Sequence, residues 1–157
     1  MTQPLEPGDR APAFELPTSK GGRASLADYK GKFLILFFYP KDDTEACTKE
    51  AIAFSEVLPK FTRKGAAVLG VSRDSLVDHK AFVAKYDLKV RLGSDEDGTV
   101  CNAFGVWQEK QLYGKRFMGI VRSTFLIDPE GVIRRVWRNV RVAGHVDRVE
   151  QDFLAAR

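Results

Sequence analysis

The first half of the chain is dominated by two continuous apolar segments with an amphipathic segment between them. Phe33–Tyr39 contains no charged residue and has the length and aromatic content of a strand buried on both faces. From about Thr44, apolar residues recur at helical spacing, and Pro59 within that pattern is expected to kink the helix or end it early. Ala66–Val71 then predicts a second buried strand. Strand, helix and strand of these lengths predict a βαβ unit with parallel strands.

Helical spacing returns in the second half of the chain. It predicts a helix through His79 and Tyr86, a short helix over 97–104 with Asp97 as its cap, and a last helix from about His145. His79 and His145 have no metal-ligand spacing, so we expect each at the edge of the core or on the surface. With two histidines and no paired cysteines, the sequence predicts no structural zinc site and no cofactor.

Further strands are expected near the C-terminal end. Residues 123–127 and 132–137 predict a hairpin around the turn Asp128–Gly131, whereas 105–121 show no regular pattern. Helices on both faces of a mixed central β-sheet make an α/β sandwich. The length of 157 residues and the apolar fraction of 44% fit one domain over residues 1–157.

Charge and hydropathy argue against several classes of function. The net charge of +4 is too small to indicate a nucleic-acid partner, and the densest basic segment, Arg134–Arg141, alternates like the solvent face of a strand. The longest apolar segment is far too short for a membrane span, so no membrane partner is expected. The N-terminus lacks the basic and apolar regions of a secretory signal, so we expect a cytoplasmic protein whose thiols stay reduced.

Cys47 and Cys101 are the only cysteines, and rare cysteines in a reducing compartment indicate reactivity more than structural bridging. The competing interpretation is that a free cysteine fills space in the core. Cys47 follows the first central strand and opens its helix, where α/β proteins gather their sites. Thr44 is a candidate N-cap, and its hydroxyl is expected to accept a hydrogen bond from the amide of Cys47.

The start of a helix favours a thiolate at Cys47. The positive end of the helix dipole and the unpaired amides there lower the pKa of a thiol below its usual ~8.5. The acidic neighbours Asp42, Asp43 and Glu45 act in the opposite direction. A cation near Cys47 is therefore expected, although the spacing of residues alone does not place it.

The segment around Cys47 resembles the active site of the peroxiredoxins, with Pro40, Thr44 and Cys47 in the family pattern Pro-x-x-x-Thr-x-x-Cys. It is most similar to the branch called bacterioferritin comigratory protein, or PrxQ. Residues 121–128 resemble the strand that carries the family's arginine, and the similarity extends from Pro7 to about Gly144. The resemblance implies a thioredoxin-like fold, which agrees with the predicted βαβ unit and hairpin.

The resemblance also implies a role for each residue of this site. Cys47 attacks the peroxide and becomes a sulfenic acid, Thr44 hydrogen-bonds the thiolate and the peroxide, and Pro40 shields the pocket from water. Arg122 supplies the missing cation, and Glu50 orients it. The competing interpretations are a simple helix cap for Thr44, a strand stop for Pro40 and a surface arginine for Arg122.

The chain departs from the family branch where the sulfenic acid must be reduced again. Many members carry a resolving cysteine at the position of Ile52, and another known position matches Val83. Cys101 is the other candidate, but a disulfide with Cys47 needs Cα atoms within roughly 7 Å and therefore local unfolding. Resolution by Cys101, a one-cysteine cycle with an external thiol and an intermolecular bond all stay open.

The resemblance further implies an antioxidant enzyme that reduces hydrogen peroxide and small alkyl hydroperoxides, with thioredoxin or another thiol as reductant. It also implies a monomer or a weak dimer. A thiol–disulfide oxidoreductase is a competing function, but it needs a Cys-x-x-Cys pair and this chain has Thr44 at the first of these positions. A peroxide-sensing protein without sustained turnover is another, because it would use the same chemistry at Cys47.

Overall fold

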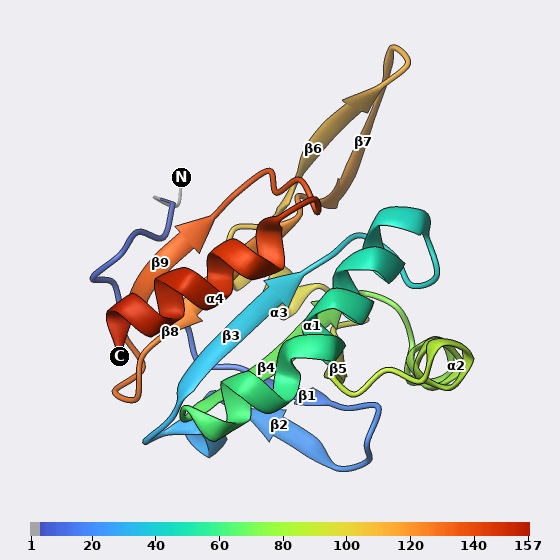
Figure 1. Cartoon of the computed structure of the whole chain (residues 1–157). Helices are drawn as coiled ribbons and strands as arrows, with labels where there is room; N and C mark the ends of the chain where they lie inside the picture. The colour runs from blue at the N-terminus through green and yellow to red at the C-terminus, as the bar shows by residue number, and fades with distance from the viewer. Residues whose placement is uncertain (1–3) are drawn as a thin grey trace.

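A mixed five-stranded sheet lies at the centre of residues 4–157, the part of the chain that this computed structural model describes (Figure 1). Its strand order is β5–β4–β3–β8–β9. The strands are β3 (Phe33–Phe38), β4 (Ala66–Ser72), β5 (Arg91–Ser94), β8 (Ser123–Ile127) and β9 (Ile133–Trp137). β3, β4 and β5 are parallel, whereas β8 is antiparallel to both β3 and β9. The predicted βαβ unit and the predicted C-terminal hairpin are both confirmed.

Helices cover both faces of this sheet, as predicted. They are α1 (Glu45–Arg63), α2 (Leu76–Tyr86), α3 (Thr99–Ala103), α4 (His145–Ala156) and the 3₁₀ helix η1 (Leu26–Tyr29). In Figure 1, α1 and α4 lie in front of the sheet and α3 lies behind it. A small hairpin of β1 (Glu15–Pro17) and β2 (Arg23–Ser25) precedes η1. Within the described residues, no helix is long and apolar enough to cross a membrane. The expectation of no secretory signal rests partly on residues 1–3, which lie outside that range.

The side chains of β3 alternate between two cores, because β3 is buried on both faces as its continuous apolar sequence predicts. Leu36 and Phe38 belong to the core on the side of α3, together with Phe104. Phe37 and Tyr39 belong to the core beneath α1, α2 and α4. The sheet therefore separates two apolar cores, and the face on which a residue lies decides which side chains it meets.

Helix α1 begins where predicted but does not end early. Thr44 is its N-cap, and the helix continues through Pro59 to Arg63. Phe54 and Phe61, on either side of the proline, are fully buried and lie against each other in the core. Burying a large apolar side chain contributes roughly 1.5–3 kcal/mol, so two rings offset the ~3 kcal/mol cost of an internal proline. The expected early end of this helix is therefore wrong.

Residues 105–121, expected to be irregular, form a second hairpin. β6 (Trp107–Leu112) and β7 (Lys115–Ile120) pair in an antiparallel ladder that projects away from the central sheet in Figure 1. Tyr113 and Gly114 between them both have positive φ angles, 52° and 77°, as in tight two-residue turns. Most side chains of this hairpin face solvent on both sides, so no apolar alternation marks it in the sequence.

The short helix expected over 97–104 is present in a shorter form, as α3. Asp97 accepts a hydrogen bond from the amide of Thr99 at 2.9 Å, although Gly98 is the N-cap. The amides further along α3 are held by Asp95, which directly follows β5. The start of this helix is therefore closed by carboxylates.

Candidate active site

Cys47 and Arg122 meet at the carboxyl end of β3. β3 and β8 pair in a register that sets Phe38 opposite Ser123, so Arg122, the residue before Ser123, lies beside the loop that follows β3. Cys47 lies just beyond that loop, in the first turn of α1. Nη2 of Arg122 donates a hydrogen bond to the Cys47 sulfur at 3.3 Å. The structure thus places a cation where the acidic neighbours of Cys47 require one.

Glu50 holds the other branch of the Arg122 guanidinium. Nη1 of Arg122 donates to a carboxylate oxygen of Glu50 at 2.6 Å, and the Glu50 side chain is fully buried one helical turn after Cys47. An isolated buried ion pair is costly, because both charges lose their hydration. Here the pair fixes the direction of the guanidinium, and its second branch points at the sulfur atom.

Burial and charge act against each other in this cluster. Burial raises the pKa of Glu50 to about 7, although Arg122 acts in the opposite direction. Burial also opposes the charge of Arg122, but Glu50 and Cys47 outweigh it and raise the pKa of Arg122. The second carboxylate oxygen of Glu50 has no hydrogen-bond partner among the described residues. Arg122 is therefore a cation at neutral pH, whereas Glu50 gains a proton close to neutral pH.

The hydroxyl of Thr44 does not bond as expected. No amide of α1 donates to it, and it donates instead to the carbonyl oxygen of Lys41 at 2.8 Å. The expected hydrogen bond from the amide of Cys47 is wrong, because the turn that begins at the half-buried Pro40 directs the hydroxyl towards Lys41. Thr44 is an exposed residue, and its hydroxyl oxygen keeps its lone pairs for a molecule that approaches Cys47.

Cys101 has the opposite surroundings. It is fully buried in α3, in the core on the other side of the sheet from Cys47. The carboxylate of Asp95 accepts hydrogen bonds from the amides of Val100 and Cys101 at 3.1 and 2.7 Å. Burial, followed by the negative charge of Asp95, raises the pKa of the Cys101 thiol far above its usual value. Both cysteines are free thiols, and the sheet lies between them.

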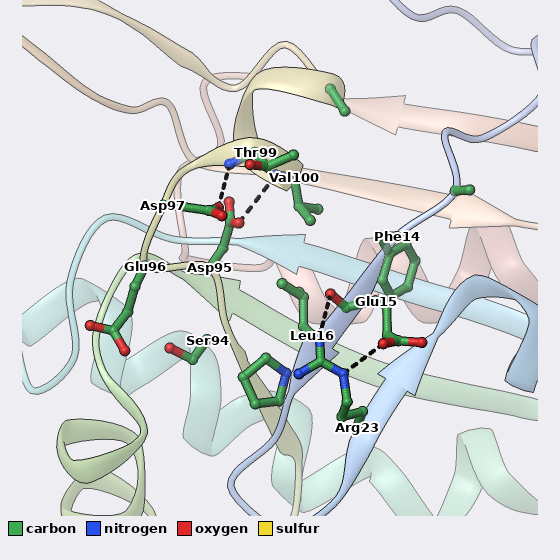
Figure 2. Close-up of a pocket in the computed structure, with 13 residues that line it drawn as sticks. Phe14, Glu15, Leu16, Arg23, Ser94, Asp95, Glu96, Asp97, Thr99 and Val100 are labelled. Carbon is green, nitrogen blue, oxygen red and sulfur yellow. Dashed lines mark hydrogen bonds and ion pairs between the residues drawn. The ribbon is translucent and has the colours of Figure 1, made fainter.

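A pocket of about 450 Å³ opens between the β1–β2 hairpin and the start of α3, on the side of Cys101 (Figure 2). Figure 2 shows that two of its carboxylates have partners in α3, because Asp95 and Asp97 accept hydrogen bonds from amides of that helix. Glu15 forms an ion pair with Arg23 at 2.7 Å. No cysteine lines this pocket, so we do not assign the thiol chemistry to it.

The two histidines are buried, and the expectation that they lie at the core edge or surface is wrong. Nδ1 of His79 lies 2.6 Å from a carboxylate oxygen of Asp42, and its Nε2 lies 2.9 Å from the carbonyl oxygen of Gly93. Nε2 of His145 lies 2.9 Å from the hydroxyl of Thr124. Each ring completes a polar interaction inside the protein with residues distant in sequence, and spacing along the chain does not reveal such partners.

Asp42, Asp74 and His79 bring their oxygen and nitrogen atoms within 4.8 Å of one another, close enough to consider a metal ion. Two ligands of one ion, each bound at roughly 2.0–2.2 Å, lie more than about 3 Å apart. Nδ1 of His79 and the nearest carboxylate oxygen of Asp42 are only 2.6 Å apart, which is the distance of a direct hydrogen bond. Asp74 accepts hydrogen bonds from the Asp42 amide and the Ser72 hydroxyl. These side chains therefore form a hydrogen-bond network that does not fit a metal ion.

Two features near Arg122 were not expected from the sequence. Lys110 in β6 donates to the carbonyl oxygen of Ile120 at 2.9 Å, and burial followed by the charge of Arg122 lowers its pKa. The β6–β7 hairpin thus brings a further cation near the site. A cavity of about 600 Å³ also borders Arg122, between the start of α1 and residues 140–143.

Comparison with known proteins finds relatives over nearly the whole chain. The model of the AhpC/TSA family matches residues 7–136. A putative peroxiredoxin bcp of Coxiella burnetii is 52% identical over 145 residues, which cover 92% of this chain and 96% of the relative. Peroxiredoxin Bcp of Escherichia coli is 40% identical over 146 residues, which cover 93% and 94% of the two chains.

Solved structures give the same result. A PrxQ mutant of Xylella fastidiosa matches with a TM-score of 0.93 and 39% identity over 99% of both chains. The bacterioferritin comigratory protein of Xanthomonas campestris, studied for alkyl peroxide reduction, matches with a TM-score of 0.87 and 45% identity over 91% of both chains. The thioredoxin-like fold and the cysteine–arginine site define a thiol-dependent peroxidase. The chain belongs to the AhpC/TSA family, among the Bcp or PrxQ peroxiredoxins.

Proposed function

We propose that the protein reduces hydrogen peroxide and small alkyl hydroperoxides, with Cys47 as the attacking thiolate. The observation that carries this proposal is the 3.3 Å contact between Arg122 and the Cys47 sulfur, which Glu50 holds in place. A guanidinium at this distance stabilises the thiolate before attack and the negative charge on the leaving oxygen during attack.

In the first half-reaction, the Cys47 sulfur attacks the terminal oxygen of the peroxide. An S–O bond forms while the O–O bond breaks, the sulfur is oxidised to a sulfenic acid, and the leaving oxygen takes up a proton to become water or an alcohol. The first amides of α1 receive no hydrogen bond from the Thr44 side chain and can donate to the peroxide oxygens. The Thr44 hydroxyl donates to Lys41 and keeps its lone pairs for the protonated peroxide oxygen. Pro40 lies at the start of the same loop and limits the entry of water.

The cavity beside Arg122 supports organic hydroperoxides as substrates. It has a volume of about 600 Å³, and apolar side chains such as Ala46, Ala53, Val140 and Val142 contribute to its lining. An alkyl group placed there would leave water while its peroxide group stays near Arg122. The related Xanthomonas campestris protein, whose structures concern alkyl peroxide reduction, supports the same substrate class.

An external thiol is the reductant that best fits the second half-reaction. Cys101 lies across the sheet in surroundings that keep its thiol protonated, and Ile52 and Val83 cannot resolve the sulfenic acid. One external thiol displaces water from the sulfenic acid and forms a mixed disulfide, and a second thiol then releases Cys47 as the free thiol. Thioredoxin, acting in the cytoplasm on a monomer or weak dimer of this protein, supplies both thiols.

A coupled assay with hydroperoxide and either thioredoxin or a small thiol tests the proposal. Cys47→Ser is expected to abolish turnover, because serine provides no comparable nucleophile, whereas the matched variant Cys101→Ser is expected to retain it. Turnover by Cys47→Ser would reject the function. A reaction that stops after one equivalent of peroxide despite excess thiol would instead favour a peroxide sensor.

Peptide mass mapping after one equivalent of peroxide tests the reductant separately. We expect modified Cys47 beside free Cys101, which corresponds to a one-cysteine cycle. A Cys47–Cys101 bridge would assign the resolving role to Cys101.

A further inference from the structure

The loop that links β3 to α1, residues 40–44, is held by a buried pair of hydrogen-bonded side chains. The carboxylate of Asp42 accepts a hydrogen bond from the Tyr39 hydroxyl at 2.6 Å and lies 2.6 Å from Nδ1 of His79. The His79 side chain in α2 is completely buried, and that of Asp42 is 6% exposed. The loop that precedes Cys47 is therefore attached to α2 at a point that water does not reach.

Both ring nitrogens of His79 face oxygen acceptors, namely Asp42 at Nδ1 and the carbonyl of Gly93 at Nε2. A neutral imidazole carries one N–H and can donate to one acceptor only. Whichever tautomer the ring adopts, its short contact of 2.6 Å with the Asp42 carboxylate is shielded from water. Removing His79 leaves that buried carboxylate without this partner, which is costly.

Asp43, the next residue, gives the loop a second attachment to α2. Its φ angle of 60° lies in the left-handed region, which Asp adopts more readily than most residues other than glycine. Its carboxylate accepts hydrogen bonds from Lys85 at 2.8 Å and Tyr86 at 2.5 Å, both at the far end of α2. These contacts are exposed and screened by solvent, so the buried pair at Asp42 is the stronger attachment.

The same loop controls access to Cys47. The Cys47 side chain is 2% exposed, so a thiol on another molecule cannot reach its sulfur while the loop and the first turn of α1 are closed. Attack on a small peroxide needs the closed arrangement, in which Arg122 contacts the sulfur. Reduction by an external thiol needs an open one. The contacts that resist opening include those that Asp42 and Asp43 make with α2 and the hydrogen bond from the Asp42 amide to Asp74.

We propose that His79 is a positioning residue that acts through Asp42. It holds residues 40–44 in the closed, peroxide-reactive arrangement, and release of the His79–Asp42 contact exposes oxidised Cys47 to the reductant. The inference rests on the proposed function, because it assigns opposite requirements to its two half-reactions. Weakening the contact slows oxidation of Cys47 and speeds its reduction, which a general loss of stability would not do.

The variant His79→Gln tests this role against His145→Gln as a matched control. His145 is also a buried histidine with a polar partner, Thr124, but it does not contact the loop. Burial lowers the pKa of His145 to about 4, so above neutral pH the control removes a neutral ring. Three rates are measured for each variant: amide hydrogen exchange over residues 40–50, oxidation of Cys47 by peroxide in one turnover, and reduction of the sulfenic acid by a small thiol.

In His79→Gln we expect about tenfold faster exchange over 40–50 and about tenfold slower oxidation, because Asp42 loses its buried partner at Nδ1 of His79. Reduction of the sulfenic acid is expected to become faster by a similar factor. In His145→Gln all three rates are expected to stay at their original values. Unchanged exchange in His79→Gln, or equal changes in both variants, would overturn the proposal.

Asp42→Asn serves if His79→Gln does not fold, because it keeps the size of the side chain but removes its charge and one of its two acceptor oxygens. Faster exchange over 40–50 is expected again, and its absence would also overturn the proposal. Exchange is measured without peroxide. A lack of Cys47 oxidation in the unaltered protein would therefore reject the proposed function, while the exchange data would still decide whether His79 holds the loop.

Discussion

Cys47 and Cys101 occupy equivalent positions with opposite surroundings. Each is almost fully buried, and each is the third residue of a helix that follows a parallel strand of the central sheet. The group that contacts Cys47 is the Arg122 guanidinium, whereas the group beside Cys101 is the Asp95 carboxylate. Burial disfavours a thiolate at both positions. The sign of the neighbouring charge, and not burial or helix position, therefore distinguishes the two thiols.

The starts of α1 and α3 also differ in how well each could stabilise an anion. Asp95 accepts hydrogen bonds from α3 amides, so the groups that favour an anion at this helix start are already used. At α1 the Thr44 side chain accepts no hydrogen bond from an amide of the helix. Its hydroxyl donates instead to the carbonyl oxygen of Lys41. A helix start becomes an anion site only when its own cap leaves the amides free.

Removing the cation is the strongest way to break this difference. Arg122→Ala is expected to slow the oxidation of Cys47 by peroxide about 100-fold or more, the usual effect of losing one preorganised donor at a developing anion. The measurement is the single-turnover rate at which peroxide oxidises Cys47. Arg122→Lys keeps the charge without the forked geometry. Its oxidation rate is expected to lie between those of the unaltered protein and Arg122→Ala. Equal rates in all three proteins would contradict the role of Arg122.

The buried carboxylate of Glu50 gives a pH-dependent prediction. Burial raises its pKa from 4.5 to about 7, so between these values the folded protein binds a proton that the unfolded chain releases. The free energy of unfolding is therefore expected to fall by roughly 3 kcal/mol as the pH rises through this range. Glu50→Gln is expected to remove this decrease, which urea unfolding at several pH values measures.

His145 provides the control for Glu50, because its titration has the opposite sign. Burial lowers the pKa of His145 from 6.5 to about 4. The free energy of unfolding is therefore not reduced by His145 above pH 6.5, and it falls as the pH decreases from 6.5 towards 4. His145→Gln is expected to remove that loss at acid pH. If Glu50→Gln does not change how the free energy of unfolding varies with pH, then Arg122 keeps Glu50 ionised over this whole pH range.

The smallest effect is expected at the start of α3. Asp95→Asn weakens two hydrogen bonds from buried amides and is expected to lower the free energy of unfolding by about 1–2 kcal/mol. Asp97→Asn is the matched change at an exposed carboxylate with one amide partner, and a smaller loss is expected there. Urea midpoints measure both. Equal losses would show that the buried cap contributes no more than the exposed one.

Local sequence pattern predicts the elements that contribute buried faces to the core. β3 and the β8–β9 hairpin are predicted at nearly their observed bounds, and α1 begins where predicted but continues beyond Pro59. The β6–β7 hairpin was missed because both its faces meet solvent, so burial selects no alternation. Its one local signal is the Tyr113–Gly114 turn, where both residues need positive φ angles.

The residues of the candidate site also differ in whether local sequence pattern predicts them. Cys47 and Thr44 follow from local pattern, because a strand end and a helix start bring them together. Arg122 lies 75 residues from Cys47, and the register of β3 with β8 brings it there, so only the family resemblance predicted it. The contact of His79 with Asp42, 37 residues away, depends on how α2 packs and was not predicted at all.

The sheet between the two cysteines also has a consequence for folding. In the unfolded chain both thiols are accessible, and an oxidant can join them before any strand has paired. Packed layers in a protein lie roughly 10 Å apart, whereas a disulfide spans Cα atoms no more than about 7 Å apart. A chain crosslinked in this way cannot insert β3 between α1 and α3. The protein is therefore expected to reach its native state only while both thiols are reduced, and refolding under oxidising conditions should yield a trapped species.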